Sequence, residues 1–379
     1  MQLFTAAQVF DGWQLHQGAA VSVTPEGRIA ALHPAGSPWP EGTARVDLGA
    51  GVLAPGLVDL QVNGGDGAMV GPETDAAQLA RICAAHARLG ATAILPTLIT
   101  DRAEITAQVI DAGREAARQR VPGFAGLHLE GPHLDPARKG AHDPALIRPM
   151  TEADLAQLSA AARALPALMV TLAPEAATPA QIAALSAAGA VVSLGHTGCA
   201  AAQAQAAEAA GARAVTHLFN AMGGLMNRAP GLVGAALTGR MAAGIIADGV
   251  HVAPECLLVA ARMKAPDGLF LVSDAMAVAG TTLERITLNG REIQRREGRL
   301  TLADGTLAGA DVTLPRAVAH MAGLGVDRAA ALAMASRVPA DLIGAQDRGR
   351  IAPGARGDLV HLSDRLELRG VWLGGVAVG

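Results

Sequence analysis

The sequence contains no tyrosine, and aromatic residues make up only 2% of its 379 residues. Unpaired bases usually stack on aromatic side chains, so the chain lacks the main platform for binding single-stranded nucleic acid. The formal net charge is -4, and lysine and arginine form no cluster that would supply the positive field required by nucleic acids or anionic membranes. We therefore expect neither nucleic acid nor a membrane as a partner.

Cysteine is also scarce, with only Cys83, Cys199 and Cys256 in the chain. They form no CxxC pair, so the sequence offers neither a zinc ribbon nor a disulfide framework. No stretch approaches the roughly 18 apolar residues of a membrane-spanning helix, and the N-terminal segment has no basic region followed by an apolar run. These features predict a location in the reducing cytoplasm.

Hydrophobic residues, in contrast, are abundant at 51%, while charged residues make up 17%. This composition supports a large buried core and argues against general disorder. The chain is longer than one ordinary domain, whereas a barrel of eight βα units takes about 250 residues. A barrel with one small additional domain fits the length.

Short apolar runs alternate with alanine-rich segments of helical periodicity from residue 52 onward, which is typical of parallel βαβ units. The predicted strands are 56–62, 91–97, 123–129, 167–172, 190–194, 213–218, 241–247 and 268–272. Helices are expected between them, among others at 75–89, 102–119, 151–164, 178–188 and 199–210. Eight such units close most simply into an α/β fold, a (β/α)8 barrel of the TIM type.

The two ends of the chain depart from this alternation. Residues 1–52 contain short apolar runs and turn residues without helical periodicity, and short strands are again expected at 349–353, 357–362 and 366–378. We predict that residues 1–52 and 350–379 pair into one small β-sandwich domain, with the barrel at 53–349 inserted between them. A polar insertion or hairpin is expected at 284–305, followed by helices near 314–323 and 327–336.

Polar side chains recur where the predicted barrel strands end. Taken singly, a histidine there is more often a hydrogen-bonded structural residue, and an aspartate is commonly a helix N-cap. Five of the strand ends, however, carry Glu130, His196, His217, His251 and Asp274. Because catalytic groups of such barrels emerge at the carboxyl ends of the strands, the joint pattern predicts a functional site.

Three of these side chains form a familiar ligand set. Glu130, His196 and His217 match the two-histidine, one-glutamate type of catalytic zinc site, whose fourth position is left to water. Such an ion lowers the pKa of its water to roughly 7 and polarises a bound carbonyl, and Asp274 can accept the proton of that water. The expected chemistry is the hydrolysis of an amide or ester.

Several longer motifs carry a family resemblance. APGLVD at 54–59, HLEGPH at 128–133, GHT at 195–197, THLFNAM at 216–222 and SDA at 273–275 resemble the amidohydrolase superfamily. Within it, HLEGPH, THLFNAM and the DGVH of 248–251 resemble the N-acetylglucosamine-6-phosphate deacetylases, over essentially the whole chain. The resemblance implies an enzyme that converts N-acetylglucosamine 6-phosphate into glucosamine 6-phosphate and acetate.

One departure from the wider superfamily concerns the metal. Many members carry HxH at the end of strand 1, where this chain has Gln61 and Asn63, which are poorer ligands for a divalent ion. The end of strand 4 also lacks the lysine that binuclear members often modify. One divalent ion per subunit is therefore expected, zinc in the first place, although iron, cobalt and manganese accept the same ligands. Gln61 stays a candidate position for a weak second ion.

The resemblance also implies roles around the substrate. Asp274 is implied as the catalytic base and His142 as a group that polarises the acetyl carbonyl. Substrate contacts are implied for Ala141, Asn220, Ala221, Arg228, His251, Leu307, Ala308 and Gly309. Similar enzymes take part of the phosphate site from a neighbouring subunit, so we expect a homodimer with the phosphate site near the interface.

Alternative functions stay open at this point. N-acetylgalactosamine 6-phosphate differs only at one sugar hydroxyl, and no residue identifies the group that would sense it. Another amidohydrolase reaction, such as that of a cyclic amidase or a nucleobase deaminase, is disfavoured by the missing HxH. A metal-free scaffold built on a decayed barrel is disfavoured by the presence of all three ligands and of Asp274.

Overall fold

Eight parallel strands form the central sheet of the computed structural model, which describes residues 1–39 and 42–379. They follow one another in space as in sequence: β8 (Leu57–Val62), β11 (Ala91–Ile99), β12 (Leu127–Glu130), β13 (Leu168–Leu172), β14 (Val191–Leu194), β15 (Ala214–Val215), β16 (Ala242–Ile245) and β17 (Leu269–Leu271). Beyond β17, Ala275 pairs with Val62 and nearly closes the sheet. The predicted TIM-type barrel and its eight strands are confirmed.

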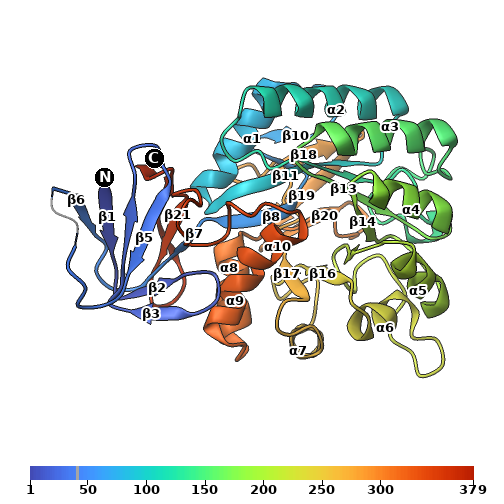
Figure 1. The fold of residues 1–379 in the computed structure, drawn as a ribbon. Helices are drawn as coiled ribbons and strands as arrows, with labels where there is room; N and C mark the ends of the chain where they lie inside the picture. The colour runs from blue at the N-terminus through green and yellow to red at the C-terminus, as the bar shows by residue number, and fades with distance from the viewer. Residues whose placement is uncertain (40–41) are drawn as a thin grey trace.

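Helices pack around the outside of the barrel (Figure 1). They are α1 (Ala76–Arg88), α2 (Ala103–Arg118), α3 (Glu152–Ala164), α4 (Pro179–Ala187), α5 (Ala201–Ala209), α6 (Gly231–Thr238), α7 (Pro254–Met263), α8 (Leu314–Gly323), α9 (Arg328–Met334) and α10 (Arg337–Leu342). Capping boxes at Thr151 and Thr178 start α3 and α4, as the sequence pattern favours. The predicted ranges did not include α6, whose central residues are all buried and show no polar face.

Two further sheets are built from the chain ends and lie on the left in Figure 1. One contains β1 (Gln2–Thr5), β4 (Ala20–Val23), β5 (Ile29–His33) and β6 (Ala44–Asp47), and the other contains β2 (Gln8–Phe10), β3 (Leu15–Gln17), β7 (Val52–Pro55), β21 (Leu359–Leu362), β22 (Leu368–Leu373) and β23 (Val376–Ala377). Phe4, Val9, Leu53 and Leu359 form a common core. Antiparallel pairing of β7 with β21 joins the two chain ends.

The prediction of a strand at 349–353 is wrong, because this segment is irregular. Gly349 has a positive φ of 67°, and Pro353 has no N–H to donate to a neighbouring strand. The division into residues 1–52 with 350–379 and residues 53–349 stays a prediction. Its first boundary falls within β7, which belongs to the sheet of the chain ends.

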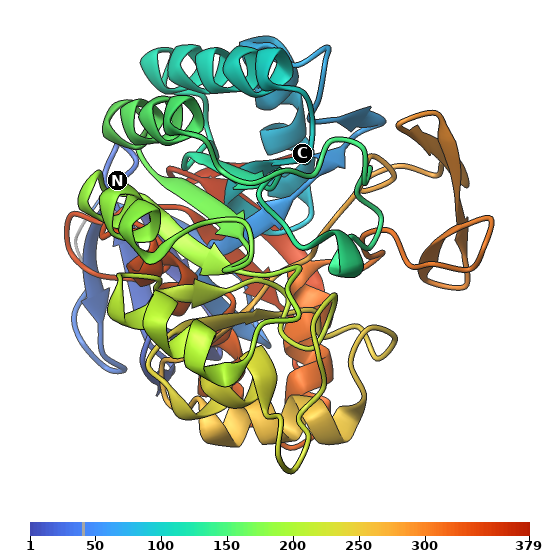
Figure 2. The same cartoon turned by 90° about the vertical axis from the view of Figure 1, so that its right-hand side faces the viewer.

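The polar insertion after the eighth barrel strand forms a three-stranded antiparallel sheet. The sequence analysis predicted an insertion or hairpin here, but not the third strand. It contains β18 (Arg285–Leu288), β19 (Arg291–Arg296) and β20 (Arg299–Leu302). Its core packs against residues that follow β17, including Met276 and Val278. Figure 2 shows this sheet projecting beside the barrel. The insertion therefore forms one side of the barrel opening.

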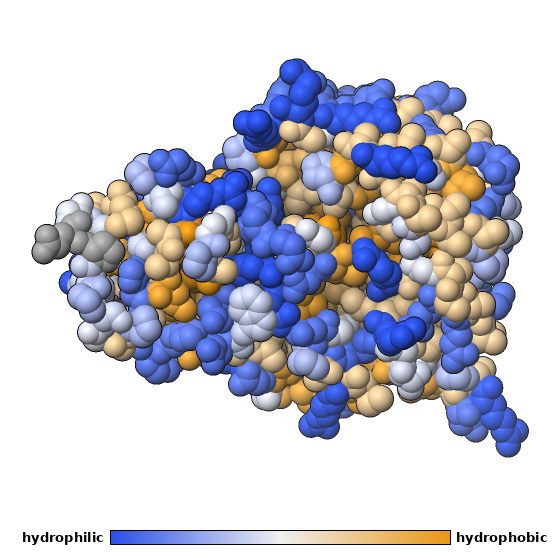
Figure 3. Space-filling model, in the orientation of Figure 1, coloured by the Kyte–Doolittle hydropathy of each residue, from blue (hydrophilic) through white to orange (hydrophobic). Residues whose placement is uncertain are grey.

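Polar and apolar side chains are mixed over the face seen in Figure 3. Within residues 1–39 and 42–379, no helix has both the length and the apolar character needed to cross a bilayer.

Candidate metal centre and active site

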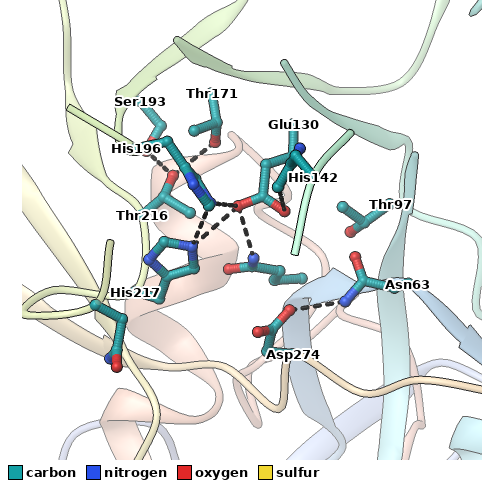
Figure 4. A network of polar contacts seen from close by, with 12 residues as sticks. Asn63, Thr97, Glu130, His142, Thr171, Ser193, His196, Thr216, His217 and Asp274 are labelled. Carbon is teal, nitrogen blue, oxygen red and sulfur yellow. Dashed lines mark hydrogen bonds and ion pairs between the residues drawn. The ribbon is translucent and has the colours of Figure 1, made fainter. Parts of the chain in front are cut away.

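The polar residues predicted at the strand ends meet at the carboxyl end of the barrel (Figure 4). Glu130 is the last residue of β12, and His196 and His217 follow β14 and β15 by two residues. Asp274 follows β17. All four residues are buried, with 2 to 9% of their surface exposed. Parallel strands therefore bring together side chains that are up to 144 residues apart in sequence (274 − 130).

Three of these residues leave their strands through an unusual backbone conformation. His196, His217 and Asp274 have positive φ values of 47°, 31° and 48°. The left-handed region costs roughly 1–2 kcal/mol for a residue with a β-carbon, and such strain concentrates at functional sites. The sequence gives only a weak signal for these turns, because aspartate and histidine adopt this region more often than most residues but much less readily than glycine.

The side-chain atoms of Glu130, His196 and His217 converge on one point. Oε1 of Glu130 lies 3.0 Å from Nε2 of His217 and 3.2 Å from Nε2 of His196. The two Nε2 atoms are 3.1 Å apart. Ligand atoms about 2.1 Å from a tetrahedral zinc ion lie roughly 3.4 Å from one another, so one ion fits between these three atoms with small adjustments.

The hydrogen bonds of His196 support this interpretation. Its Nδ1 lies 2.8 Å from the carbonyl oxygen of Arg138, to which it can donate a proton. In the neutral ring Nε2 then carries a lone pair that faces the carboxylate of Glu130 and the ring of His217. A cation between these atoms removes the repulsion, and a carbonyl behind a ligating histidine is the usual orienting partner. The residues present therefore fit a divalent ion.

The pKa of Glu130 agrees with this role. Burial alone would raise it, but the adjacent imidazole rings of His196 and His217 hold it well below its usual value, so the side chain is a carboxylate. Gln61 donates from Nε2 to the same carboxylate oxygen over 3.2 Å. An amide N–H directed at Glu130 is a donor and not a metal ligand.

His142 is the other histidine close to this group, and its ligand atom lies within 4.8 Å of those of Glu130 and His196. Its Nδ1 accepts from the backbone N–H of Thr100 over 3.3 Å and lies 2.7 Å from the Thr100 hydroxyl. Nε2 of the neutral ring therefore carries the proton. Burial lowers the pKa of His142 to about 3. His142 is thus a neutral donor, whereas His217 is the better third ligand.

Asp274 lies on the opposite side of the group. Its Oδ1 accepts from Nδ2 of Asn63 over 2.7 Å. Burial, with the charge of Glu130 as the second cause, raises the pKa of Asp274 to about 6. A carboxylate with a pKa near neutrality both accepts and returns a proton at physiological pH.

A cavity of about 400 Å³ opens above these side chains. Of the fourteen residues predicted at the site, twelve line it: Glu130, Ala141, His142, His196, His217, Asn220, Ala221, His251, Asp274, Leu307, Ala308 and Gly309. Gln61 donates to Glu130 but does not line the cavity. Arg228 is exposed on the loop before α6 and does not line the cavity of its own chain.

Other residues of the cavity were not predicted. Asn63 follows β8 directly, and its position at a strand end was the available signal. Ile99, Met276 and Leu288 add apolar walls. Leu288 comes from the inserted sheet, and no local pattern indicates that this sheet folds back over the barrel.

His251 is held by its neighbour in sequence. Its Nδ1 lies 2.6 Å from Oδ2 of Asp248, whose pKa stays below its usual value: burial opposes ionisation, but the hydrogen bonds of His251 outweigh it. This contact fixes the ring at the edge of the cavity.

The comparisons with known proteins agree with this geometry. The model of the "Amidohydrolase family" matches residues 52–378. This chain belongs to the amidohydrolase family. N-acetylgalactosamine-6-phosphate deacetylase of Shewanella sp. (strain ANA-3) is 38% identical over 99% of this chain and 95% of its own length. The human N-acetylglucosamine-6-phosphate deacetylase is 36% identical over 88% of this chain and 85% of its own.

Solved structures of other amidohydrolases extend the likeness to three dimensions. N-acetylglucosamine-6-phosphate deacetylase from Pasteurella multocida has a TM-score of 0.94 and 31% identity, covering 99% of both chains. A mutant of the Mycobacterium smegmatis enzyme, in complex with N-acetyl-D-glucosamine-6-phosphate, has a TM-score of 0.90 and 33% identity, covering 100% of this chain and 99% of that one.

Proposed function

We propose that this amidohydrolase removes the acetyl group of N-acetylglucosamine 6-phosphate, producing glucosamine 6-phosphate and acetate. The convergence of Glu130, His196 and His217 beside Asp274, in one cavity, carries this proposal. The relatives that bear the corresponding name match most of the chain at more than 30% identity. The cavity, at about 400 Å³, is within the usual range for a small ligand.

Glu130, His196 and His217 would hold one divalent ion, with zinc as the proposed metal. Bound there, the ion would supply Lewis acidity, which favours ionisation of water and stabilises negative charge on the carbonyl oxygen. Iron, cobalt and manganese accept the same ligands, so metal analysis of the purified protein is the direct test.

Asp274 and His142 would handle the protons and charge of the reaction. Asp274 accepts a proton as water adds to the acetyl carbon, and returns it to the amine nitrogen as the C–N bond breaks. His142 donates from Nε2 to the carbonyl oxygen, on which negative charge develops. The contact with Thr100 keeps that proton on Nε2.

The sugar and its phosphate would occupy the rest of the cavity. His251 would hydrogen-bond to the sugar, while Ala141 and residues 307–309 line its pocket. The backbone of Asn220 and Ala221 would receive the phosphate. Because Arg228 lies outside the cavity of its own chain, we propose that it completes the phosphate site of a second subunit in a homodimer. A cytoplasmic location is part of the same proposal.

N-acetylgalactosamine 6-phosphate is a second candidate substrate. Two curated relatives that carry the corresponding name, from Shewanella and Escherichia coli O157:H7, are 38% and 36% identical over 99% and 92% of this chain. The two sugars differ at a single hydroxyl, so the same catalytic residues serve both.

Acetate release from both phosphosugars and from N-acetylglucosamine tests the function. We expect turnover of the phosphosugars, with a much lower kcat/KM for the unphosphorylated sugar and for the Arg228→Ala variant on phosphosugars. The higher kcat/KM of the two phosphosugars identifies the preferred substrate. Absence of acetate release from all three compounds, with one metal ion bound per chain, would refute the proposal.

A further inference from the structure

A second cavity lies at the opposite, amino end of the barrel strands. It has a volume of about 360 Å³. Its walls are the end of α2, the residues before β12 and β13, and the segment 343–348 after α10. None of its lining residues lines the active-site cavity.

Three arginines line this cavity: Arg120, Arg348 and Arg356. Asp347 is the only carboxylate among the lining residues, which leaves an excess of two positive charges (3 − 1). Asp347 also contacts Arg28 from outside the cavity, with 3.2 Å between Oδ2 and Nη1. Asp358, beside the cavity, accepts from Nε of Arg356 over 2.7 Å. The cavity thus has more positive charge than its carboxylates balance.

Arg348 is the most unusual of the three. Only 16% of its side chain is exposed, and its single ion contact, Nε to Oδ1 of Asp347, is long at 3.9 Å. Its Nη1 is buried without a hydrogen-bond partner in the part of the chain that the structure describes. Burial also lowers the pKa of its guanidinium. A buried guanidinium N–H without a hydrogen-bond partner is costly, and the negative charge of a bound anion would offset part of that cost.

We propose that this cavity binds a phosphate group, either inorganic phosphate or the phosphate of a small metabolite. Guanidinium groups match phosphate oxygens with paired N–H donors, and the excess of two charges suits a phosphate dianion better than a single carboxylate. The cavity is large enough for a phosphorylated sugar. The proposal rests on residues separate from the catalytic site and does not depend on the deacetylase function.

Calorimetric titration of the metal-loaded protein with inorganic phosphate, and separately with glucosamine 6-phosphate, tests the site. Arg348→Met removes the charge and keeps an unbranched apolar stem in place of the arginine methylenes. We expect it to bind one phosphate fewer per chain than the parent protein. Arg120→Gln, an exposed position, should weaken that site about tenfold or more. Arg240→Gln, an exposed arginine outside the cavity, serves as the matched control and should bind as the parent does.

The active site also binds phosphate in the proposed function, and the site count separates the two. If the parent binds two phosphates per chain and Arg348→Met binds one, both proposals are supported. If the parent binds one and Arg348→Met binds none, only the site at the amino end is supported. Equal numbers and affinities in the parent, Arg348→Met and Arg120→Gln would overturn it. Should Arg348→Met fail to fold, Arg120→Gln decides alone. Binding of only one of the two titrants at this site identifies the source of the phosphate.

Discussion

The two ends of the barrel carry opposite chemistry on the same eight strands. At the carboxyl end, Glu130 and Asp274 face imidazole rings in a cavity of about 400 Å³. At the amino end, arginines line a cavity of about 360 Å³. Glu130, His196, His217 and Asp274 at the carboxyl end lie at or shortly after the ends of barrel strands. The arginines of the amino end come from the chain just after α2 and from the chain that returns after α10.

This difference shows how position in the fold determines what each end can do. A residue that follows a barrel strand is anchored by the sheet, so its side chain is placed within the tolerance that bond-breaking chemistry requires. A residue beyond a helix end is held less tightly, but binding of an anion requires less precise placement of the side chain. We therefore expect substitutions at the carboxyl end to change turnover, and substitutions at the amino end to leave it unchanged.

The largest effect is expected for Asp274→Asn. The amide cannot accept the proton of water or return it to the amine, so kcat should fall by about 10⁴-fold. Asp274 is not among the proposed metal ligands, so metal content should stay at the parent value. Steady-state kinetics with metal analysis of the same samples measures both. Turnover near the parent level would show that another group is the base.

The pH dependence of the parent protein gives a second test of Asp274. The base must be ionised, so kcat should decline as the pH falls through the pKa, which burial raises to about 6 in the absence of a cation. A divalent ion nearby favours the carboxylate and moves this acid limb to lower pH. A pH profile from 4 to 8, recorded with the parent and with Asp274→Asn, should show the limb in the parent only. An acid limb retained in the variant would assign it to another group.

The next effect concerns His142, the proposed donor to the carbonyl oxygen. His142→Ala removes one donor at the developing negative charge and should lower kcat by about 10²- to 10³-fold. Thr100→Val removes the hydroxyl beside Nδ1 and keeps the backbone N–H that sets the tautomer, so its loss should be smaller. Parallel kcat measurements on the two variants compare them. Equal losses of kcat in the two variants would mean that the Thr100 hydroxyl, and not the His142 ring, accounts for the rate enhancement assigned to His142.

The contrast between the two ends also explains what the sequence could reveal. Eight strands and the residues following them were predicted, because a buried strand leaves an apolar run and a polar residue at its end is conspicuous. The left-handed turns at His196, His217 and Asp274 were not, because they depend on tertiary contacts. Leu288 reaches the cavity through the inserted sheet, and Arg348 becomes buried through packing of distant segments, so neither has a local signal.

Between the two ends, Asp59 should affect stability rather than turnover. Burial raises its pKa to about 7, although backbone N–H groups of Gln61 and Ser273 donate to it. Between pH 4 and pH 7 the Asp59 carboxyl keeps its proton in the folded protein but loses it in the unfolded chain, where its pKa is near 4. The folded state is therefore favoured most below pH 4, and this stabilisation is lost as the pH rises to about 7. When the pH is raised from 5 to 8, the free energy of unfolding of the parent should fall by on the order of 2 kcal/mol more than that of Asp59→Asn.

Denaturant unfolding of both proteins at the two pH values measures this difference. The variant keeps an oxygen acceptor at the same position and cannot titrate, so the comparison isolates Asp59 from other groups. Parallel loss of stability in both proteins would show that Asp59 is already ionised at pH 5.

The smallest effect is expected for Gln61→Ala. Gln61 stands where many superfamily members carry a metal-ligating histidine, yet it donates from Nε2 to Oε1 of Glu130 over 3.2 Å. That N–H contacts the oxygen that we propose as a metal ligand and also orients the carboxylate, so removal of the amide should change metal affinity by about tenfold. The number of ions should stay at one per chain, measured by metal analysis after dialysis. A fall from two ions to one would instead assign a second, weaker ion to Gln61. The carboxyl end would then hold a two-ion site, and the role of Asp274 would have to be re-examined with both ions bound.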